Sequence, residues 1–132
     1  MLSHVYVGVA DFDRAFAFYE LVLGELGLVL RFRDDDEMWA GWQAPDAGRP
    51  LFLIGRPFDG QPAAAGNGQM TAFQSPDRAT VVRCYEAALA AGGTSEGEPG
   101  LRPQYHPNYY GAYFRDLDGN KLCVCCHEPG ST

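Results

Sequence analysis

The sequence has few basic residues, and this shortage limits the partners that it can bind. It holds 10 Lys and Arg against 17 Asp and Glu among 132 residues, which gives a net charge of −7. Nucleic acids and anionic membranes are held by clustered cations, so we expect neither as a partner. An acidic surface favours a cationic ligand instead, although acidity that serves solubility alone is the more common case.

Long apolar runs and ordered cysteine spacings are also missing. No stretch approaches the roughly 18 apolar residues of a membrane helix, and residues 1–9 lack the basic start of an export signal. The cysteines do not have the spacing of a disulfide framework or a zinc knuckle. They are Cys84, Cys123, Cys125 and Cys126. These absences predict a soluble, cytoplasmic protein with reduced thiols.

The chain repeats itself at an offset of 66 residues, half of its length. The matched pairs are Asp11 with Asp77, Tyr19 with Tyr85, Leu23 with Leu89, and Gly27 with Gly93. A chain of this length and 46% hydrophobic composition can bury one core. We therefore expect a single domain over 1–132, with module one at 1–56, a linker at 57–67 and module two at 68–129.

Each half contains an amphipathic helix. After Asp11, apolar side chains recur at the i, i+3, i+4 spacing of a helix, which we expect Asp11 to cap and Gly27 to end. In the second half, Ser75 is the expected N-cap and Pro76 the first helical residue, and the helix should end at Gly92.

Short strands are expected before and after each helix. In module one they cover 4–9, 28–33, 37–42 and 51–54, and in module two 70–73, a vague stretch around Thr94, 108–115 and 121–126. The turn at 116–120 is rich in acids, Gly and Asn, and should join an antiparallel hairpin. That hairpin would place Tyr113 opposite Cys123. The order is βαβββ twice, which predicts an α+β fold.

The segment 109–122, Tyr-Tyr-Gly-Ala-Tyr-Phe-Arg-Asp-Leu-Asp-Gly-Asn-Lys-Leu, resembles the carboxy-terminal signature of the vicinal-oxygen-chelate superfamily of glyoxalases, bleomycin-resistance proteins and dioxygenases. That signature usually ends Asp-Pro-Asp-Gly-Asn, and Leu117 replaces the proline here. With His4 on the first strand and the duplicated helices, the resemblance covers the whole chain. It implies two paired βαβββ modules that form a curved, partly open mixed sheet around a cavity, and a homodimer.

The resemblance also implies where metal-dependent members hold a divalent ion. The three ligand positions map onto His4, Met70 and Cys123 of this chain. A thioether is too soft for the ions that such sites usually employ, and a Cys123 thiolate would need further ligands to hold zinc. We therefore predict no metal ligands and disfavour a divalent metal as cofactor. Recruitment of Cys125 or His127 stays open, but buried inert thiols are more common.

A small-molecule pocket is the resulting prediction. Its expected lining is His4, Tyr6, Met70, Ala72, Tyr113 and Cys123, with His4 and Cys123 as catalytic candidates. Core packing is about as good an explanation for Tyr6, Met70 and Ala72 as ligand contact. Trp39 and Trp42 also enter as ligand-binding candidates. They lie three apart on a strand and must point to opposite faces, so at most one reaches the pocket.

Two functions of different classes fit these residues. The preferred one is a metal-free protein that binds a small aromatic or cationic molecule, which resembles the bleomycin-resistance branch. The alternative is a metal-dependent lyase or dioxygenase with a remodelled site at His4 and Cys123. A metal-free enzyme with Cys123 as nucleophile is a third hypothesis, for which the sequence shows no neighbouring base. The roles of Cys125, Cys126, His106 and His127 stay open.

Overall fold

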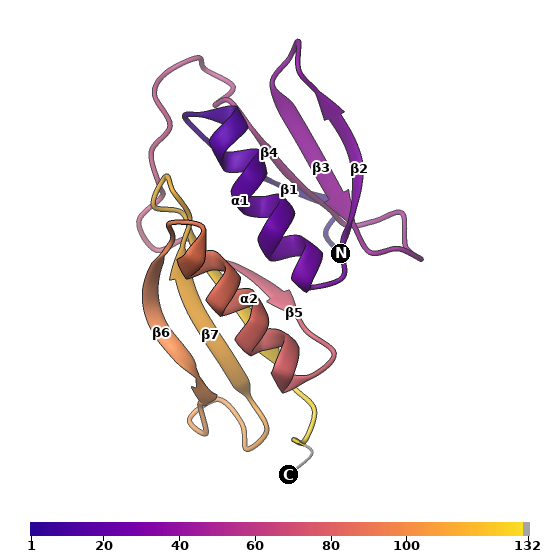
Figure 1. Cartoon of the computed structure of the whole chain (residues 1–132), viewed down its shortest axis with the longest axis vertical. Helices are drawn as coiled ribbons and strands as arrows, with labels where there is room; N and C mark the ends of the chain where they lie inside the picture. Colours follow the sequence, from indigo (N-terminus) through magenta and orange to yellow (C-terminus); the bar gives the residue numbers. More distant parts are fainter. Residues whose placement is uncertain (131–132) are drawn as a thin grey trace.

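Two four-stranded sheets and two helices make up the protein, and a computed structural model describes residues 1–130. The first module holds β1 (His4–Gly8), α1 (Phe12–Glu25), β2 (Val29–Asp34), β3 (Trp39–Gln43) and β4 (Leu51–Gly55). The second holds β5 (Thr71–Gln74), α2 (Arg78–Ala90), β6 (Thr94–Leu101), β7 (Tyr110–Arg115) and β8 (Lys121–Cys126). The predicted βαβββ order is confirmed in both modules (Figure 1).

Both sheets have the same mixed topology. The strand order is β1-β4-β3-β2 in the first and β5-β8-β7-β6 in the second, and the two sheets are not joined into a closed barrel. The pairs β1–β4 and β5–β8 are parallel, and the remaining pairs are antiparallel. In the β7–β8 hairpin, Tyr113 lies opposite Cys123, as the turn at 116–120 predicts.

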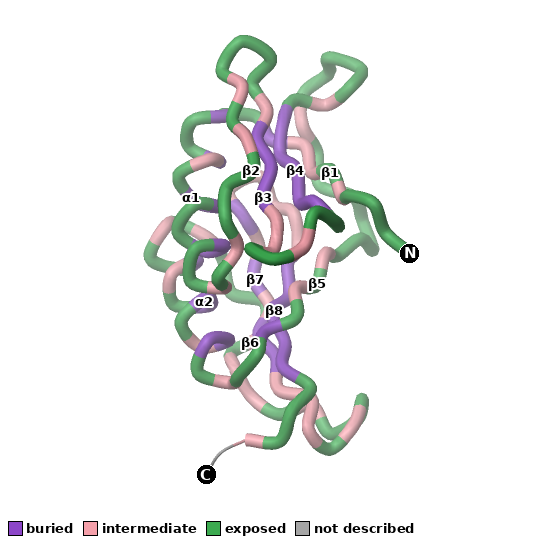
Figure 2. The backbone as a smooth tube through the Cα atoms, turned by 90° about the vertical axis from the view of Figure 1, so that its right-hand side faces the viewer, coloured by how far each residue is buried: buried purple, intermediate pink, exposed green. Residues whose placement is uncertain are grey.

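The helices cover one face of the sheets and leave the other face open. α1 and α2 lie side by side across the two modules (Figure 1), and Figure 2 shows both on one side of the strands. One hydrophobic core joins the modules, because it includes buried residues of both helices and both sheets. Phe52 of β4 meets Phe73 of β5 across the boundary, with ring centroids 5.0 Å apart. Within residues 1–130, no helix has the length and apolar character needed to span a membrane.

The start of α2 differs from the sequence-based expectation. Asp77 caps the helix, since its carboxylate accepts a hydrogen bond from the Thr80 amide at 2.7 Å. Ser75, the predicted cap, is buried, and its hydroxyl donates to the Asp77 carbonyl. A serine followed by proline looks like a cap in sequence, but the chain turns once more before the helix begins. Asp11 caps α1 as predicted and accepts from the Arg14 amide.

A buried carboxylate ties the first module to the second. Asp116, in the turn before β8, accepts a hydrogen bond from the Tyr19 hydroxyl of α1 at 2.5 Å. Burial and the neighbouring Asp116 carboxylate raise the pKa of Tyr19, so the tyrosine stays a neutral donor. Tyr85, which matches Tyr19 in the repeat, donates instead to Ser95 of its own module. The two modules are therefore linked by a buried polar contact that the repeat does not duplicate.

Candidate functional site

The open face of the sheets carries most of the predicted site residues. Val5 and Val7 pack against the core, so His4 and Tyr6, which alternate with them on β1, point away from the helices. On β7 and β8, the residues that flank Tyr113 and Cys123 belong to the core, so these two side chains share the open face as well. Trp39 also points to this face.

Trp42 has the opposite orientation. It is buried beneath α1, and its indole Nε1–H donates to the Glu20 carboxylate at 3.2 Å. Its ring packs against Phe16 with centroids 5.4 Å apart. The two tryptophans therefore face opposite sides of β3, as the strand period requires. Trp39 is the one available to an open-face ligand.

A wide groove lies over the first sheet, between β1, the β2–β3 hairpin and the linker. Its volume is about 1190 Å³. We call it the Trp39 groove and define it by six of its lining residues, Tyr6, Glu37, Trp39, Arg56, Phe58 and Asp59. Phe58 is fully exposed on the linker, while Trp39 is half-buried and packs edge-on against Phe32 at 4.7 Å. Three aromatic rings thus border one concave surface.

Tyr6 is fixed in place at the floor of this groove. Its hydroxyl donates to the Arg56 carbonyl at 2.6 Å. The ring passes directly over Gly55, where a Cβ would clash with the phenol, so only glycine fits there. Burial raises the pKa of Tyr6, which keeps the hydroxyl a neutral donor. Tyr6 therefore presents an aromatic ring in a fixed orientation to the groove, and its hydroxyl stays protonated.

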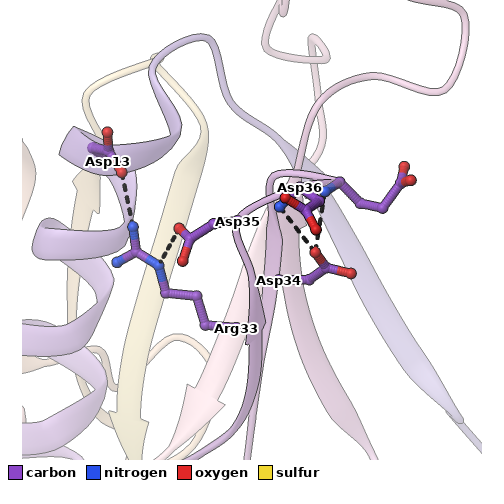
Figure 3. Close-up of polar contacts among 6 residues, drawn as sticks. Asp13, Arg33, Asp34, Asp35 and Asp36 are labelled. Atoms are coloured by element: carbon purple, nitrogen blue, oxygen red, sulfur yellow. Dashed lines mark hydrogen bonds and ion pairs between the residues drawn. The ribbon is translucent and has the colours of Figure 1, made fainter.

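Carboxylates dominate the charge of the groove. Glu37 and Asp59 line it, with Arg56 as the cationic residue of the lining. Glu37 follows an acidic turn in which the Asp34 carboxylate accepts from the backbone amides of Asp36 and Glu37, at 3.0 and 3.1 Å (Figure 3). This turn sets the backbone of Glu37 at the end of the hairpin and adds negative charge beside the groove.

The same hairpin is anchored to α1 by a cation. Arg33 contacts the carboxylates of Asp13 at 2.8 Å and Asp35 at 2.9 Å (Figure 3). Its guanidinium also lies over the Phe16 ring, 4.2 Å from the centroid. One wall of the groove is therefore attached to the helical layer rather than free at its tip.

Two smaller cavities follow the boundary between the modules. One, of about 480 Å³, shares Tyr6 with the Trp39 groove and brings it together with Met70 and Lys121. The other, of about 430 Å³, is largely apolar and includes Met70, Ala72 and the edge of Trp42. Four predicted ligand-binding residues are thus distributed over three adjoining hollows, namely Tyr6, Trp39, Trp42 and Met70.

Tyr113 and Cys123 form a separate cluster on the second sheet. The Tyr109 hydroxyl lies 3.0 Å from that of Tyr113 and 3.5 Å from the Cys123 sulfur. Hydrogen bonding of the Cys123 thiol to the Cys125 sulfur, and then burial, raise the pKa of Cys123. Burial is also the main cause that raises the pKa of Tyr109. Cys123 is therefore a protonated, buried thiol rather than a free thiolate.

The implied metal-ligand positions do not fit a divalent ion. His4 is exposed, and its Nδ1 shares a hydrogen bond with Ser3 Oγ at 2.9 Å. Met70 offers only a thioether, which is too soft for the ions that such sites usually employ, and Cys123 would need further ligands to hold zinc. Among the 130 residues that the structure describes, no three His, Cys, Asp or Glu side chains are grouped to hold a metal.

Several lining residues were missed by the sequence analysis. Phe58 and Asp59 lie in the stretch interpreted only as a linker, and Glu37 was assigned to a strand. The usable signal was an aromatic residue inside a segment otherwise rich in Gly, Pro and Ala. Tyr109 was placed in the last hairpin, but its contact with Cys123 depends on a ring that passes over Gly111, where a Cβ would lie 2.9 Å from it.

Comparison with known proteins gives one family and many similar folds. Residues 1–124 match the family model described as the Glyoxalase/Bleomycin resistance protein/Dioxygenase superfamily. No curated protein matches the chain. A glyoxalase/bleomycin resistance protein from Albidiferax ferrireducens T118 is 35% identical, and its crystal structure superposes with a TM-score of 0.83 over 97% of this chain and 99% of that one.

More distant structures share the fold alone. A glyoxalase-related enzyme from Fulvimarina pelagi is 16% identical, with a TM-score of 0.74 over 96% of this chain and 87% of that one. A lactoylglutathione lyase from Agrobacterium tumefaciens is 23% identical, with a TM-score of 0.64 over 96% and 92%. At such identities the likeness extends to the arrangement of strands and helices, and not to the chemistry of the site.

Proposed function

Because the chain belongs to the Glyoxalase/Bleomycin resistance protein/Dioxygenase superfamily, we propose that it uses the open face of that fold to bind a small aromatic cation without a metal ion. The observation that carries this proposal is the composition of the Trp39 groove. Three aromatic residues and two carboxylates border one groove with a volume of about 1190 Å³. Aromatic rings with a few convergent polar groups are the usual lining of a small-molecule site.

The chemistry of the groove favours a positive, planar ligand. Trp39 and Phe58 offer aromatic faces, which attract both flat rings and cations. Glu37 and Asp59 supply negative charge, and the net charge of −7 steers cations toward the protein. The groove holds no histidine or cysteine that could act as a nucleophile or metal ligand. Binding, rather than chemistry on the ligand, is therefore the function that these residues support best.

Replacing Trp39 with alanine should weaken the binding of an aromatic cation by roughly tenfold or more, which corresponds to about 1.4 kcal/mol of lost stacking and cation–π energy. Benzyltrimethylammonium and acriflavine are suitable probes. Isothermal titration calorimetry measures the affinity, and raising the salt concentration should weaken it, because exposed carboxylates are screened.

Tyr105→Ala is the matched control for this substitution. Tyr105 is an exposed aromatic residue of the second module and does not line the groove, so its removal should leave the affinity unchanged. A Glu37→Gln, Asp59→Asn double variant should reduce the salt dependence. If neither probe binds the wild-type protein, or if Trp39→Ala and Tyr105→Ala bind equally well, the proposed site is wrong.

The alternative metal-dependent enzyme makes a different prediction. A metal ion present at 100 times its dissociation constant would stabilise the fold by about 2.7 kcal/mol. Since His4, Met70 and Cys123 do not form a donor set for such an ion, we expect zinc, iron, nickel and manganese to leave the melting temperature unchanged. Thermal denaturation with and without each metal tests this, together with elemental analysis of protein purified without chelator. Stoichiometric metal would favour the enzyme.

A further inference from the structure

A chain of hydrogen bonds ends at a cysteine on the open face of the second sheet. His127 follows β8, and its Nε2 lies 3.7 Å from the Cys125 sulfur. His127 Nδ1 lies 2.8 Å from Nε2 of His106, and the two rings are stacked with centroids 5.1 Å apart. His106 Nδ1 in turn accepts a hydrogen bond from the Asn108 backbone amide at 3.1 Å.

This last contact fixes the direction of the whole chain. A backbone N–H can only donate, so Nδ1 of His106 carries no proton, and the proton of the neutral ring sits on Nε2. That N–H then donates to His127 Nδ1. Because Nδ1 accepts this hydrogen bond, the N–H of the neutral His127 ring is at Nε2. His127 therefore directs an N–H at the Cys125 sulfur. It acts as a donor that stabilises the thiolate and not as a base that would accept the thiol proton.

The face of the sheet that carries Cys125 also carries hydrogen-bond donors for the negative charge that moves from the sulfur to the electrophile. The hydroxyls of Tyr109 and Tyr113 lie on the same face of the sheet, and the Tyr109 ring passes over Gly111, the residue paired with Cys125. A nucleophilic sulfur on the same face as neutral hydroxyls suits an electrophile whose carbonyl oxygen gains charge on attack.

We propose that Cys125 is a nucleophile for small, uncharged α,β-unsaturated carbonyl compounds, with His127 and His106 as its positioning residues. The thiol proton leaves to solvent, and the thiolate bonds to the β-carbon. The π electrons shift through the α-carbon to the carbonyl oxygen, and a proton from water then completes the saturated thioether. No leaving group or oxidant is needed. This site lies on the second module, apart from the Trp39 groove, and does not depend on the proposed ligand binding.

Size restricts which compounds can react. Cys125 is only 5% exposed, and Cys84, Cys123 and Cys126 are more deeply buried, at 0 or 1%. Acrylamide is therefore the probe, since it is small, neutral and an unsaturated carbonyl compound. On the native protein we expect Cys125 to be alkylated roughly ten times faster than any other cysteine, as hydrogen-bonded thiolates react faster than buried thiols.

Peptide mass spectrometry after timed exposure to acrylamide measures each cysteine separately. His127→Ala and His106→Ala should each slow the labelling of Cys125 several-fold, while His127→Gln, whose amide still donates, should recover part of the rate. Circular dichroism confirms that each variant is folded. If access to the sulfur alone set the rate, His127→Ala would instead speed the labelling of Cys125, because the ring would no longer cover the sulfur. Equal labelling of all cysteines, an unreactive Cys125, or an unchanged or faster rate in both histidine variants would overturn the proposal.

Discussion

Replacing Asp116 with alanine is expected to lower the free energy of unfolding by about 3 to 5 kcal/mol. The buried carboxylate accepts hydrogen bonds from the Tyr19 hydroxyl, from the amides of Asp118 and Asn120, and from the Asn120 side chain. Alanine leaves these donors without an acceptor, and each buried donor that stays unpaired costs roughly 1 to 3 kcal/mol. Urea denaturation followed by circular dichroism measures the change.

The first module offers a matched control for this substitution. Asp46 stands five residues before β4, as Asp116 stands five residues before β8, but it is exposed. Asp46→Ala should therefore change stability by less than about 0.5 kcal/mol. Tyr19→Phe removes one donor only and should fall between the two. Equal stabilities for the Asp116 and Asp46 variants would show that the contact between modules contributes nothing.

Phe52→Ala should lower the free energy of unfolding by a similar amount, roughly 3 to 5 kcal/mol, because it leaves a cavity in the core where the modules meet. The centroid of the Phe52 ring lies 5.1 Å from that of Tyr19 and 5.0 Å from that of Phe73, and Phe52 is 5% exposed. One shared core also predicts a single unfolding transition, both in the wild type and in this variant. Differential scanning calorimetry measures the number of transitions and the shift in melting temperature.

Phe58→Ala separates packing from ligand contact. Phe58 is fully exposed on the linker, so its loss should leave stability nearly unchanged while weakening the binding of aromatic cations to the Trp39 groove. Phe52→Ala should instead lower stability and leave the affinity for aromatic cations unchanged, at temperatures where it stays folded.

The common core has its own contradicting outcome. It would be ruled out by two resolved transitions in the wild-type protein, one for each module.

The fold was predictable because its signals are local and occur twice. The spacing of apolar residues after Asp11, and the turn at 116–120 with Gly119 at a φ of +86°, each indicate one structure with few competitors. Errors arose where a second local signal was equally good. Ser75 and Asp77 are both capable N-caps, and only the burial of Ser75 decides between them.

The site was less predictable because it depends on contacts between distant segments. Strand alternation placed Tyr6 and Trp39 on the open face, yet nothing in the sequence shows that the linker brings Phe58 and Asp59 beside them. The contact of His106 with His127 joins a loop to the residue that follows β8, 21 positions apart. Homodimer formation and cytoplasmic location depend on neighbours of the chain, and both stay predictions.

The contact between Tyr19 and Asp116 has no counterpart in the other direction, and this breaks the symmetry of the duplication. Tyr85, which matches Tyr19, donates its hydrogen bond to Ser95, and Asp46 of the first module is exposed to solvent. The two halves are therefore no longer interchangeable. Two copies of the first half would lack the buried acceptor Asp116. In two copies of the second half, the tyrosine at the matching position, Tyr85, already donates to Ser95. The two halves share one symmetry in the backbone, whereas the specificity of one half for the other resides in a few side chains.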